Sequence, residues 1–486
     1  MASFKVNIKW GKTKFDNVLV NQGEAPEVFQ AQLFALSGVP LERQKIMAKG
    51  KALKDGSWDG FVLKDGMTIL MMGSADELPA APVQKTQFVE DMSDSQLAKA
   101  TDLPAGLTNL GNTCYMNATI QCLKNVPELK QELKRYNGQL SFGGIMANPS
   151  DAVTISLRDL YSMMDRAADS FPPIMFLQVL HTVFPHFAEK TEQGVYQQQD
   201  ANECWNQLVR MLHQRLPSIK PNEETPAAEA ASKPASMVDQ YFGIDMKSSL
   251  KCDESAEEPE THSTDQLYQL SCFISQDVKY MHTGLVSRLK ESITKHSPSL
   301  GRDASYTKTS VINRLPAYLT IQFVRFFYKE KEKVNAKILK DVKFPLNLDV
   351  YELCSPELKT KLKVMRDKFQ EEEEKVAEKK LKMIKDEKQE NGNKTETVLP
   401  SSFADDIGSN NSGYYELSAV LTHRGRSSSS GHYVAWVRRK GDEWLMCDDD
   451  NVSNVTSQDV LKLSGGGDWH CAYVLLYAPK KLTITE

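Results

Sequence analysis

The N-terminal 75 residues change their hydrophobic period along the chain. Alternating apolar and polar positions predict a half-buried strand over 4–10 and a second strand over 15–20. Apolar residues then recur at helical spacing between Pro26, which suits a first helical turn, and Gly38, which suits a helix end. A short apolar run around Ile46 and an alternating segment at 67–71 complete the pattern. Together they predict a compact ββαβ-type domain over residues 1–75.

The remainder of the chain is helix-rich in front and strand-rich behind, which predicts an α+β domain over residues 101–480. Residues 76–100 are rich in Ala, Pro, Asp and Glu, so we expect a linker before this domain. Three polar segments within it are expected to be mobile, although the last is rich in Lys and Glu and could instead form an exposed helix. These segments are 217–236, 253–265 and 357–397. Apolar strands are expected at 318–326, 414–421, 433–437 and 472–477.

Composition narrows the classes of partner and compartment. The formal net charge is −5, with acids and bases spread along the chain, so no basic field favours nucleic acid. No run approaches the roughly twenty apolar residues of a transmembrane helix, and the first thirty residues lack the layout of a secretory signal. We therefore expect a soluble monomer in the cytoplasm, with the nucleus as a second compartment. The eight cysteines form no C-x-x-C pair, which argues against disulfides and a complete zinc site.

Candidate chemistry begins at residues 106–123, where glycines and short polar residues precede an apolar-periodic segment. This order places Cys114 in the first turn of a helix. Unpaired amides and the positive end of the helix dipole favour a thiolate there, which is the reactive form. An isolated cysteine is more often a small core residue, so Cys114 needs a partner to be a convincing nucleophile.

A partner appears far along the chain, where His432 stands at the start of a predicted strand. The chain is expected to turn around 440–443 and return to the acidic run 448–450, so a hairpin would bring Asp448 beside the imidazole. A carboxylate on one imidazole nitrogen fixes the tautomer and leaves the other nitrogen for the thiol. Taken alone, such a histidine is more often incidental, and an acidic triplet is usually a polar turn.

Three boxes in this order are similar to the ubiquitin-specific protease family. They are Gly-Leu-Thr-Asn-Leu-Gly-Asn-Thr-Cys-Tyr-Met-Asn at 106–117, Gln-Gln-Asp-Ala-Asn-Glu at 198–203, and Gly-His-Tyr-Val at 431–434 with its Asp-Asp follower. The resemblance implies a papain-like domain of fingers, palm and thumb that hydrolyses isopeptide and thioester bonds at the C-terminal glycine of ubiquitin. No cofactor is expected. The competing interpretations are a ubiquitin-binding scaffold without catalysis and a papain-like peptidase of broad specificity.

The resemblance also implies roles for single residues. Cys114 is the nucleophile, His432 the general base and Asp448 the orienting acid, with Asp449 as the alternative for that last role. Asn109 matches the position whose amide donates to the oxyanion, or it supports the glycine-rich turn. Residues expected to bind the ubiquitin tail are Gln199, Asp200, Ser429, Gly431 and Tyr433. For Gln199 and Asp200, helix capping or a structural hydrogen bond is an equal alternative.

The first 75 residues resemble ubiquitin itself, with the run 43–51 at the place of its recognition strand. Met72-Gly73-Ser74-Ala75 replaces the double-glycine tail, so we expect a docking module that is neither cleaved nor conjugated. Met47, Leu70 and Met72 occupy the places of ubiquitin's exposed apolar patch, unless they are partly core. A ubiquitin-like domain before the protease core narrows the resemblance to proteasome-associated members, which implies docking on the proteasome regulatory particle.

Two further expectations concern the fingers and a loop. Paired cysteines are missing where zinc-ribbon fingers would carry them, because Cys252 and Cys272 stand singly, so fingers without zinc are predicted. Residues 424–431 are small, flexible and polar and lead directly into His432. We hypothesise that this loop gates the site and opens when the N-terminal domain docks; an ordinary mobile loop is the alternative.

Overall fold

The computed structural model describes residues 3–53, 56–74, 103–167, 169–219, 235–329, 334–385, 396–427, 430–467 and 469–485. The chain divides into two compact units, 1–88 and 89–486. The whole segment expected as a linker, 76–100, including the boundary between the units, lies outside the described residues. Among the helices that are described, none combines the length and apolar character needed to cross a membrane.

The first unit is a five-stranded sheet with one helix, ordered β2-β1-β5-β3-β4, in which β1 and β5 run parallel. Its core holds the apolar residues that set the predicted periods, among them Ile8, Leu33 and Ile69, all fully buried. Gly38, at φ 72°, ends the helix as expected. The order of strands and helix agrees with the predicted ββαβ-type domain, and this arrangement is a β-grasp fold. Its elements are β1 (Ser3–Trp10), β2 (Thr13–Asn21), α1 (Pro26–Ser37), β3 (Lys45–Ala48), β4 (Lys51–Ala52) and β5 (Thr68–Met72).

The second unit begins with helices, as predicted, and they pack with the face of a sheet into one hydrophobic core. Pro127 and Pro149 each open a helix at its first position, where a missing N–H costs nothing. The helices are α3 (Cys114–Lys124), α4 (Pro127–Arg135), α5 (Pro149–Met164), α6 (Ile174–Val183), α7 (Ala201–Arg215) and α8 (Met237–Phe242).

An eight-stranded sheet carries the second half of this unit, in the order β19-β18-β17-β16-β20-β11-β8, with β14 also paired to β16. The predicted strands at 414–421, 433–437 and 472–477 lie at its centre as β16, β17 and β20, where both faces are covered. Its strands are β8 (Leu270–Phe273), β11 (Leu319–Val324), β14 (Asn347–Asp349), β16 (Tyr414–Ser427), β17 (Ser430–Lys440), β18 (Glu443–Asp448), β19 (Asn451–Thr456) and β20 (Cys471–Pro479).

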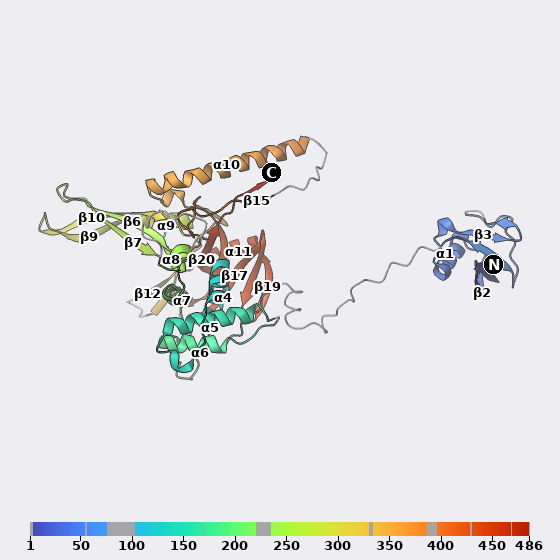
Figure 1. Cartoon of the computed structure of the whole chain (residues 1–486), viewed down its shortest axis with the longest axis horizontal. Helices are drawn as coiled ribbons and strands as arrows, with labels where there is room; N and C mark the ends of the chain where they lie inside the picture. Colours follow the sequence, from blue (N-terminus) through green and yellow to red (C-terminus); the bar gives the residue numbers. More distant parts are fainter. Residues whose placement is uncertain are drawn as a thin grey trace. The chain divides into compact units, whose positions relative to one another are not determined.

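A separate four-stranded sheet, ordered β7-β6-β10-β9, projects from the body of the second unit (Figure 1). A small cluster around Cys252 and Tyr306 packs within it. Two further pairs of strands, β12 with β13 and β15 with β21, lie outside the larger sheets. The elements are β6 (Ile244–Cys252), β7 (Thr261–Leu267), α9 (Met281–Leu289), β9 (Lys290–Ser297), β10 (Arg302–Arg314), β12 (Phe326–Lys329), β13 (Val334–Lys337), β15 (Glu396–Val398), α11 (Ser457–Leu461) and β21 (Thr483–Thr485).

Two of the three segments expected to be mobile contain regular structure within the described residues. The prediction for 253–265 is wrong from Thr261 onward, because β7 pairs with β6 there although every residue of β7 is exposed. Polar side chains therefore did not prevent backbone pairing. In the third segment the alternative helix is present as α10 (Pro356–Lys385), which anchors Leu358, Leu362 and Phe369 against the domain. Most of the first segment, 220–234, lies outside the described residues.

Candidate active site

The cysteine stands behind a tight turn. Gly111 and Asn112 both adopt left-handed conformations, at φ 97° and 55°, and reverse the chain just before α3. Thr113 precedes the helix and accepts a hydrogen bond from Leu110 N to its hydroxyl at 2.9 Å. Cys114 is thus the first residue of α3, with its side chain 2% exposed. The structure therefore confirms the predicted position of Cys114 in the first turn of a helix.

Asn109 supports this turn with one end of its side chain. Its Oδ1 accepts hydrogen bonds from Gly111 N at 3.0 Å and Thr113 N at 3.2 Å. Its Nδ2 donates one hydrogen to Asp449 Oδ2 at 2.9 Å. An amide nitrogen carries two hydrogens, so a second remains for an oxyanion. The two alternatives for Asn109 are therefore compatible within one geometry.

The imidazole and its carboxylate come from neighbouring strands. β17 and β18 form the predicted hairpin, in which Lys440 pairs with Glu443 at the turn. His432 Nε2 lies 2.5 Å from Asp448 Oδ1, and the side chain of Cys114 is close enough to the imidazole to raise its pKa. The structure thus joins Cys114, His432 and Asp448, although 318 positions separate the first from the second in sequence.

These contacts favour charge separation in the site. The hydrogen bond that His432 donates to Asp448, followed by the interaction with Cys114, raises the pKa of His432 to about 10 against the opposing effect of burial. The same bond to His432 lowers the pKa of Asp448. His432 is consequently a stable imidazolium at neutral pH, which is the charge state that stabilises a neighbouring thiolate.

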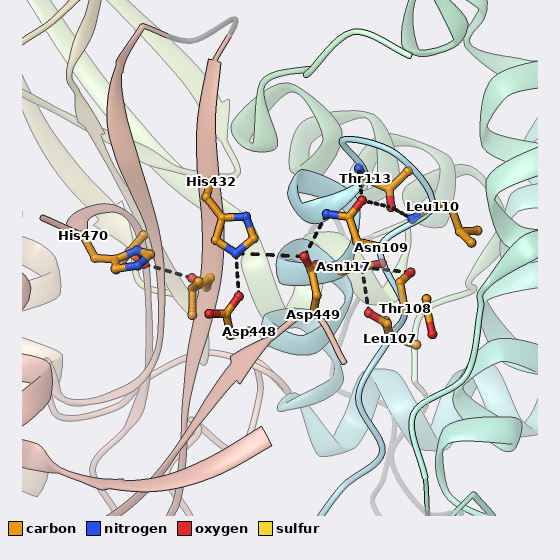
Figure 2. A network of polar contacts seen from close by, with 12 residues as sticks. Leu107, Thr108, Asn109, Leu110, Thr113, Asn117, His432, Asp448, Asp449 and His470 are labelled. Carbon is orange, nitrogen blue, oxygen red and sulfur yellow. Dashed lines mark hydrogen bonds and ion pairs between the residues drawn. The ribbon is translucent and has the colours of Figure 1, made fainter. Parts of the chain in front are cut away.

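Asp449 lies between the two sides of the site (Figure 2). Its Oδ1 accepts from Asn117 Nδ2 and its Oδ2 from Asn109 Nδ2, each at 2.9 Å, while its backbone oxygen accepts from Leu107 N at 2.8 Å. Its Oδ2 is 4.0 Å from His432 Nε2, well outside hydrogen-bonding distance. Burial raises the pKa of Asp449, and the two amide bonds oppose that rise.

This geometry assigns the two aspartates to different neighbours. Asp448 bonds the imidazole, as expected, whereas Asp449, the alternative for that task, bonds the asparagines. Sequence reasoning missed the contact of Asp449 with Asn109 and Asn117. Asn117 was visible as an amide within an apolar helix, but the link to Asp449 depends on tertiary contact.

The imidazole and the two carboxylates could in principle hold a cation. His432, Asp448 and Asp449 place one potential ligand atom each within 4.8 Å of one another. The short hydrogen bond between His432 and Asp448 already occupies two of these atoms, which favours an acid–base pair. In the projecting sheet, Cys252 packs near Tyr306, while Cys272 lies in a different core cluster and donates to Met281 O. These two thiols therefore do not converge on one point.

The residues expected to bind the ubiquitin tail occupy varied positions. Asp200 caps α7, accepting from Asn202 N at 2.7 Å, and also accepts from Tyr473 Oη, so capping is the role its contacts show. Gln199 is half-buried and donates to His186 O. Asp200 therefore caps a helix and Gln199 makes a structural hydrogen bond, which are the two alternatives to binding the ubiquitin tail.

Two of the other expected tail-binding residues are held by packing. The side chain of Tyr433 is 1% exposed and lies in the core against His423, which does not support direct contact with a substrate. Gly431, at φ 130°, packs so tightly that a Cβ would lie 2.1 Å from Arg424 O. Ser429 is outside the described residues, as is its neighbour at 428, so the gating hypothesis for 424–431 stays a prediction.

The predicted docking residues share one face of the N-terminal sheet. Met47 of β3 is paired with Leu70 of β5, and Lys45 is paired with Met72, so the three apolar side chains point the same way. Leu70 and Met72 are 40% and 44% exposed, and Met47 is partly buried. The core of this unit is formed by the intervening residues Ile46 and Met71.

A thiol that interacts with an imidazole, which in turn is hydrogen-bonded to a carboxylate, beside a turn with a free amide hydrogen, is the arrangement of a cysteine-type hydrolase. The family model described as "Ubiquitin carboxyl-terminal hydrolase" matches residues 105–477. The chain therefore belongs to the ubiquitin carboxyl-terminal hydrolase family, and it is a cysteine-type deubiquitinating enzyme with ubiquitin conjugates as substrates.

Curated relatives match nearly the whole chain. Ubiquitin carboxyl-terminal hydrolase 6 of Arabidopsis thaliana is 43% identical over 97% of this chain and 98% of its own. Ubiquitin carboxyl-terminal hydrolase 14 of Caenorhabditis elegans is 40% identical over 97% and 92%, and ubiquitin carboxyl-terminal hydrolase 6 of Schizosaccharomyces pombe is 38% identical over 98% and 99%. The similarity thus includes the ubiquitin-like unit as well as the hydrolase domain.

Proposed function

We propose that this enzyme uses Cys114, His432, Asp448 and Asn109 to release ubiquitin from conjugates at the proteasome. The observation that carries the catalytic assignment is His432 placed between Cys114, with which it interacts, and Asp448, to which it is hydrogen-bonded. The proposed site of action rests on the ubiquitin-like unit in front of the hydrolase domain and on its exposed apolar face.

Acylation begins at the thiolate. Cys114 Sγ attacks the carbonyl carbon of the isopeptide bond that follows the C-terminal glycine of ubiquitin, and a tetrahedral oxyanion forms. The free Nδ2 hydrogen of Asn109 stabilises that oxyanion, a contribution of the kind worth roughly 3–4 kcal/mol in other hydrolases. His432, protonated and held by Asp448, gives its proton to the leaving lysine amine as the carbon–nitrogen bond breaks.

Deacylation uses the same imidazole in the opposite direction. Neutral His432 takes a proton from water, the hydroxide attacks the thioester carbonyl, and Cys114 leaves as a thiolate paired with the imidazolium. Ubiquitin departs with a free carboxylate. Both half-reactions pass through His432, so its loss should affect every turnover.

A ubiquitin carrying a C-terminal electrophile tests the nucleophile directly. We expect it to label Cys114 in the intact chain and to leave the Cys114→Ala variant unlabelled, with mass spectrometry of the digest locating the adduct. Labelling at another cysteine, or an unlabelled intact chain that still binds ubiquitin, would favour the scaffold interpretation. A broad peptidase would instead cleave short unstructured peptides as efficiently as ubiquitin conjugates.

Docking is proposed to occur through the apolar face formed by Met47, Leu70 and Met72. Replacing all three with Ser should release the enzyme from purified proteasome particles in co-sedimentation. Activity on ubiquitin with a fluorogenic C-terminus should stay unchanged. A matched triple change on α1, Val28→Ser, Phe34→Ser and Leu36→Ser, alters exposed apolar residues elsewhere in the same unit and serves as the control. Equal loss in both variants would reject the assigned face.

We further propose that the enzyme acts as a monomer in the cytoplasm, with the nucleus as a second compartment. Fractionation of cells and sedimentation of the purified chain would test these two points separately.

A further inference from the structure

Three surface hollows of the hydrolase domain adjoin one another. The central one, of about 280 Å³, shares Asn125, Arg438 and Arg439 with a larger hollow of about 830 Å³. It shares Lys130 with a third hollow of about 350 Å³ between α4 and α5. Because neighbouring hollows share lining residues, they adjoin one another, and we name the surface that they form together the basic trough.

The charge of the basic trough differs from that of the whole protein. Nine lysine or arginine side chains and three carboxylates line it, although the chain has a net charge of −5. At the α4–α5 end, Asp165 is shared by Lys124 at 3.0 Å and Lys130 at 2.8 Å. Those two cations lower the pKa of Asp165, so this carboxylate stays charged and is already neutralised. The exposed cations Lys134 and Arg166 remain as excess positive charge.

The opposite end of the basic trough has the same character. Glu416 is paired with Arg438 at 2.8 Å, and Glu128 accepts a hydrogen bond from Tyr318 Oη at 2.6 Å. Both carboxylates therefore have internal partners, while Lys440 and Lys481 are exposed along the rim. The positive field thus extends over the whole basic trough.

The floor of the larger hollow indicates what kind of anion would fit. Its lining includes the partly exposed apolar residues Tyr241, Ala478 and Pro479 together with its cations. A polyphosphate offers nothing to cover such surface, whereas a peptide that alternates acidic and apolar side chains matches both features. We propose that the basic trough is a docking site for an acidic, partly apolar peptide segment of a protein partner.

The basic trough lies at the far ends of the elements that carry the reaction. α3 has Cys114 as its first residue and Lys124 as its last, about 15 Å along the helix. β17 likewise carries His432 near its start and Arg438 near its end. Asn125, which directly follows α3, joins it to β17 there, with Nδ2 donating to Arg438 O at 3.4 Å. A bound segment would therefore leave the catalytic residues uncovered, and this proposal does not depend on their assigned roles.

The test uses the full chain and a fluorescein-labelled peptide of about fourteen residues that alternates Glu with Leu and Tyr, long enough when extended to follow the trough. Fluorescence anisotropy should show saturable binding that weakens as salt rises, because the contacts are exposed charge pairs. A peptide with Lys in place of Glu should not bind.

Two double variants examine the two ends separately. Lys134→Glu with Arg166→Glu, and Lys440→Glu with Lys481→Glu, should each weaken peptide binding at least tenfold. Lys361→Glu with Lys363→Glu, on the exposed side of α10, changes the net charge equally and should bind as the parent chain does. Hydrolysis of ubiquitin with a fluorogenic C-terminus should stay within twofold in all three, which also reports that they fold.

Several results would overturn the proposal. Equal weakening by the α10 variant would mean that net charge, not the basic trough, attracts the peptide. Binding of inositol hexakisphosphate at the trough without binding of the acidic peptide would assign the surface to polyphosphates. Salt-sensitive dimers that the trough variants abolish, seen by sedimentation without any peptide, would assign it to a second copy of this chain.

Discussion

The two sides of the active site are held in place by different forces. On the strand side, His432 and Asp448 stand on neighbouring strands whose backbones pair from Ala435 with Cys447 to Lys440 with Glu443. On the loop side, Asn109 and the turn before Cys114 depend on side-chain hydrogen bonds. One carboxylate, Asp449, links the two sides. The proton-transfer pair is therefore preorganised by the sheet, whereas the oxyanion side is preorganised by a single buried side chain.

Removing the nucleophile or the base should have the largest effect on catalysis. Cys114→Ala or His432→Ala should lower kcat by roughly 10⁴-fold or more, because both acylation and deacylation use these groups. Binding of ubiquitin, measured by calorimetry, should change little. Full activity in His432→Ala would contradict the assigned base.

Breaking the strand side alone should have the next largest effect. Asp448→Asn keeps the shape of the side chain but removes the charge that holds the imidazolium, and we expect kcat to fall by roughly 10²- to 10⁴-fold. NMR of His432 should show its pKa falling from about 10 toward the ordinary value. An unchanged histidine pKa in this variant would show that Asp448 does not orient the base.

Breaking the loop side should lower kcat less than breaking the strand side, and it should leave the pKa of His432 unchanged. Asn109→Ala and Asp449→Asn should each reduce kcat by roughly 10- to 10³-fold, since a misplaced amide stabilises the oxyanion poorly. If Asp449 acts through Asn109, the double variant should be no worse than the more damaged single variant. The His432 pKa should stay raised in Asp449→Asn. Additive losses, or a fall in that pKa, would mean that Asp449 serves the imidazole instead.

The smallest expected effect is on stability as a function of pH. The folded pKa of His432 is about 10 and its unfolded value about 6.5, so the stabilisation is complete below pH 6.5 and is lost as the pH rises through 10. Asp448 has a lowered pKa, so its contribution persists down to acidic pH. The melting temperature of the parent chain should therefore exceed that of Asp448→Asn most near pH 5–6 and least near pH 10. A difference that grows with pH would reverse the assigned direction.

How far the sequence predicts the structure depends on the range of the interaction. The period of the apolar residues locates β1, α1 and the central strands β16, β17 and β20, because local spacing decides which face is buried. The same reasoning failed for β7, whose exposed residues carry no such period and pair only because β6 offers an edge. Tyr433 was placed correctly in a strand, but its burial against His423 was not foreseen.

The sequence by itself was enough to locate the nucleophile and the base. Cys114 at the start of a helix and His432 near the start of a hairpin are both local patterns. The hairpin also made Asp448 predictable, because sixteen positions suffice for two strands and a turn. Only the tertiary structure decided which aspartate bonds the imidazole and which bonds the asparagines. It also decided that lysines and arginines from α3, α4, α5 and β17 line one trough. Such contacts join residues hundreds of positions apart, and no local spacing encodes the packing that brings them within hydrogen-bonding distance.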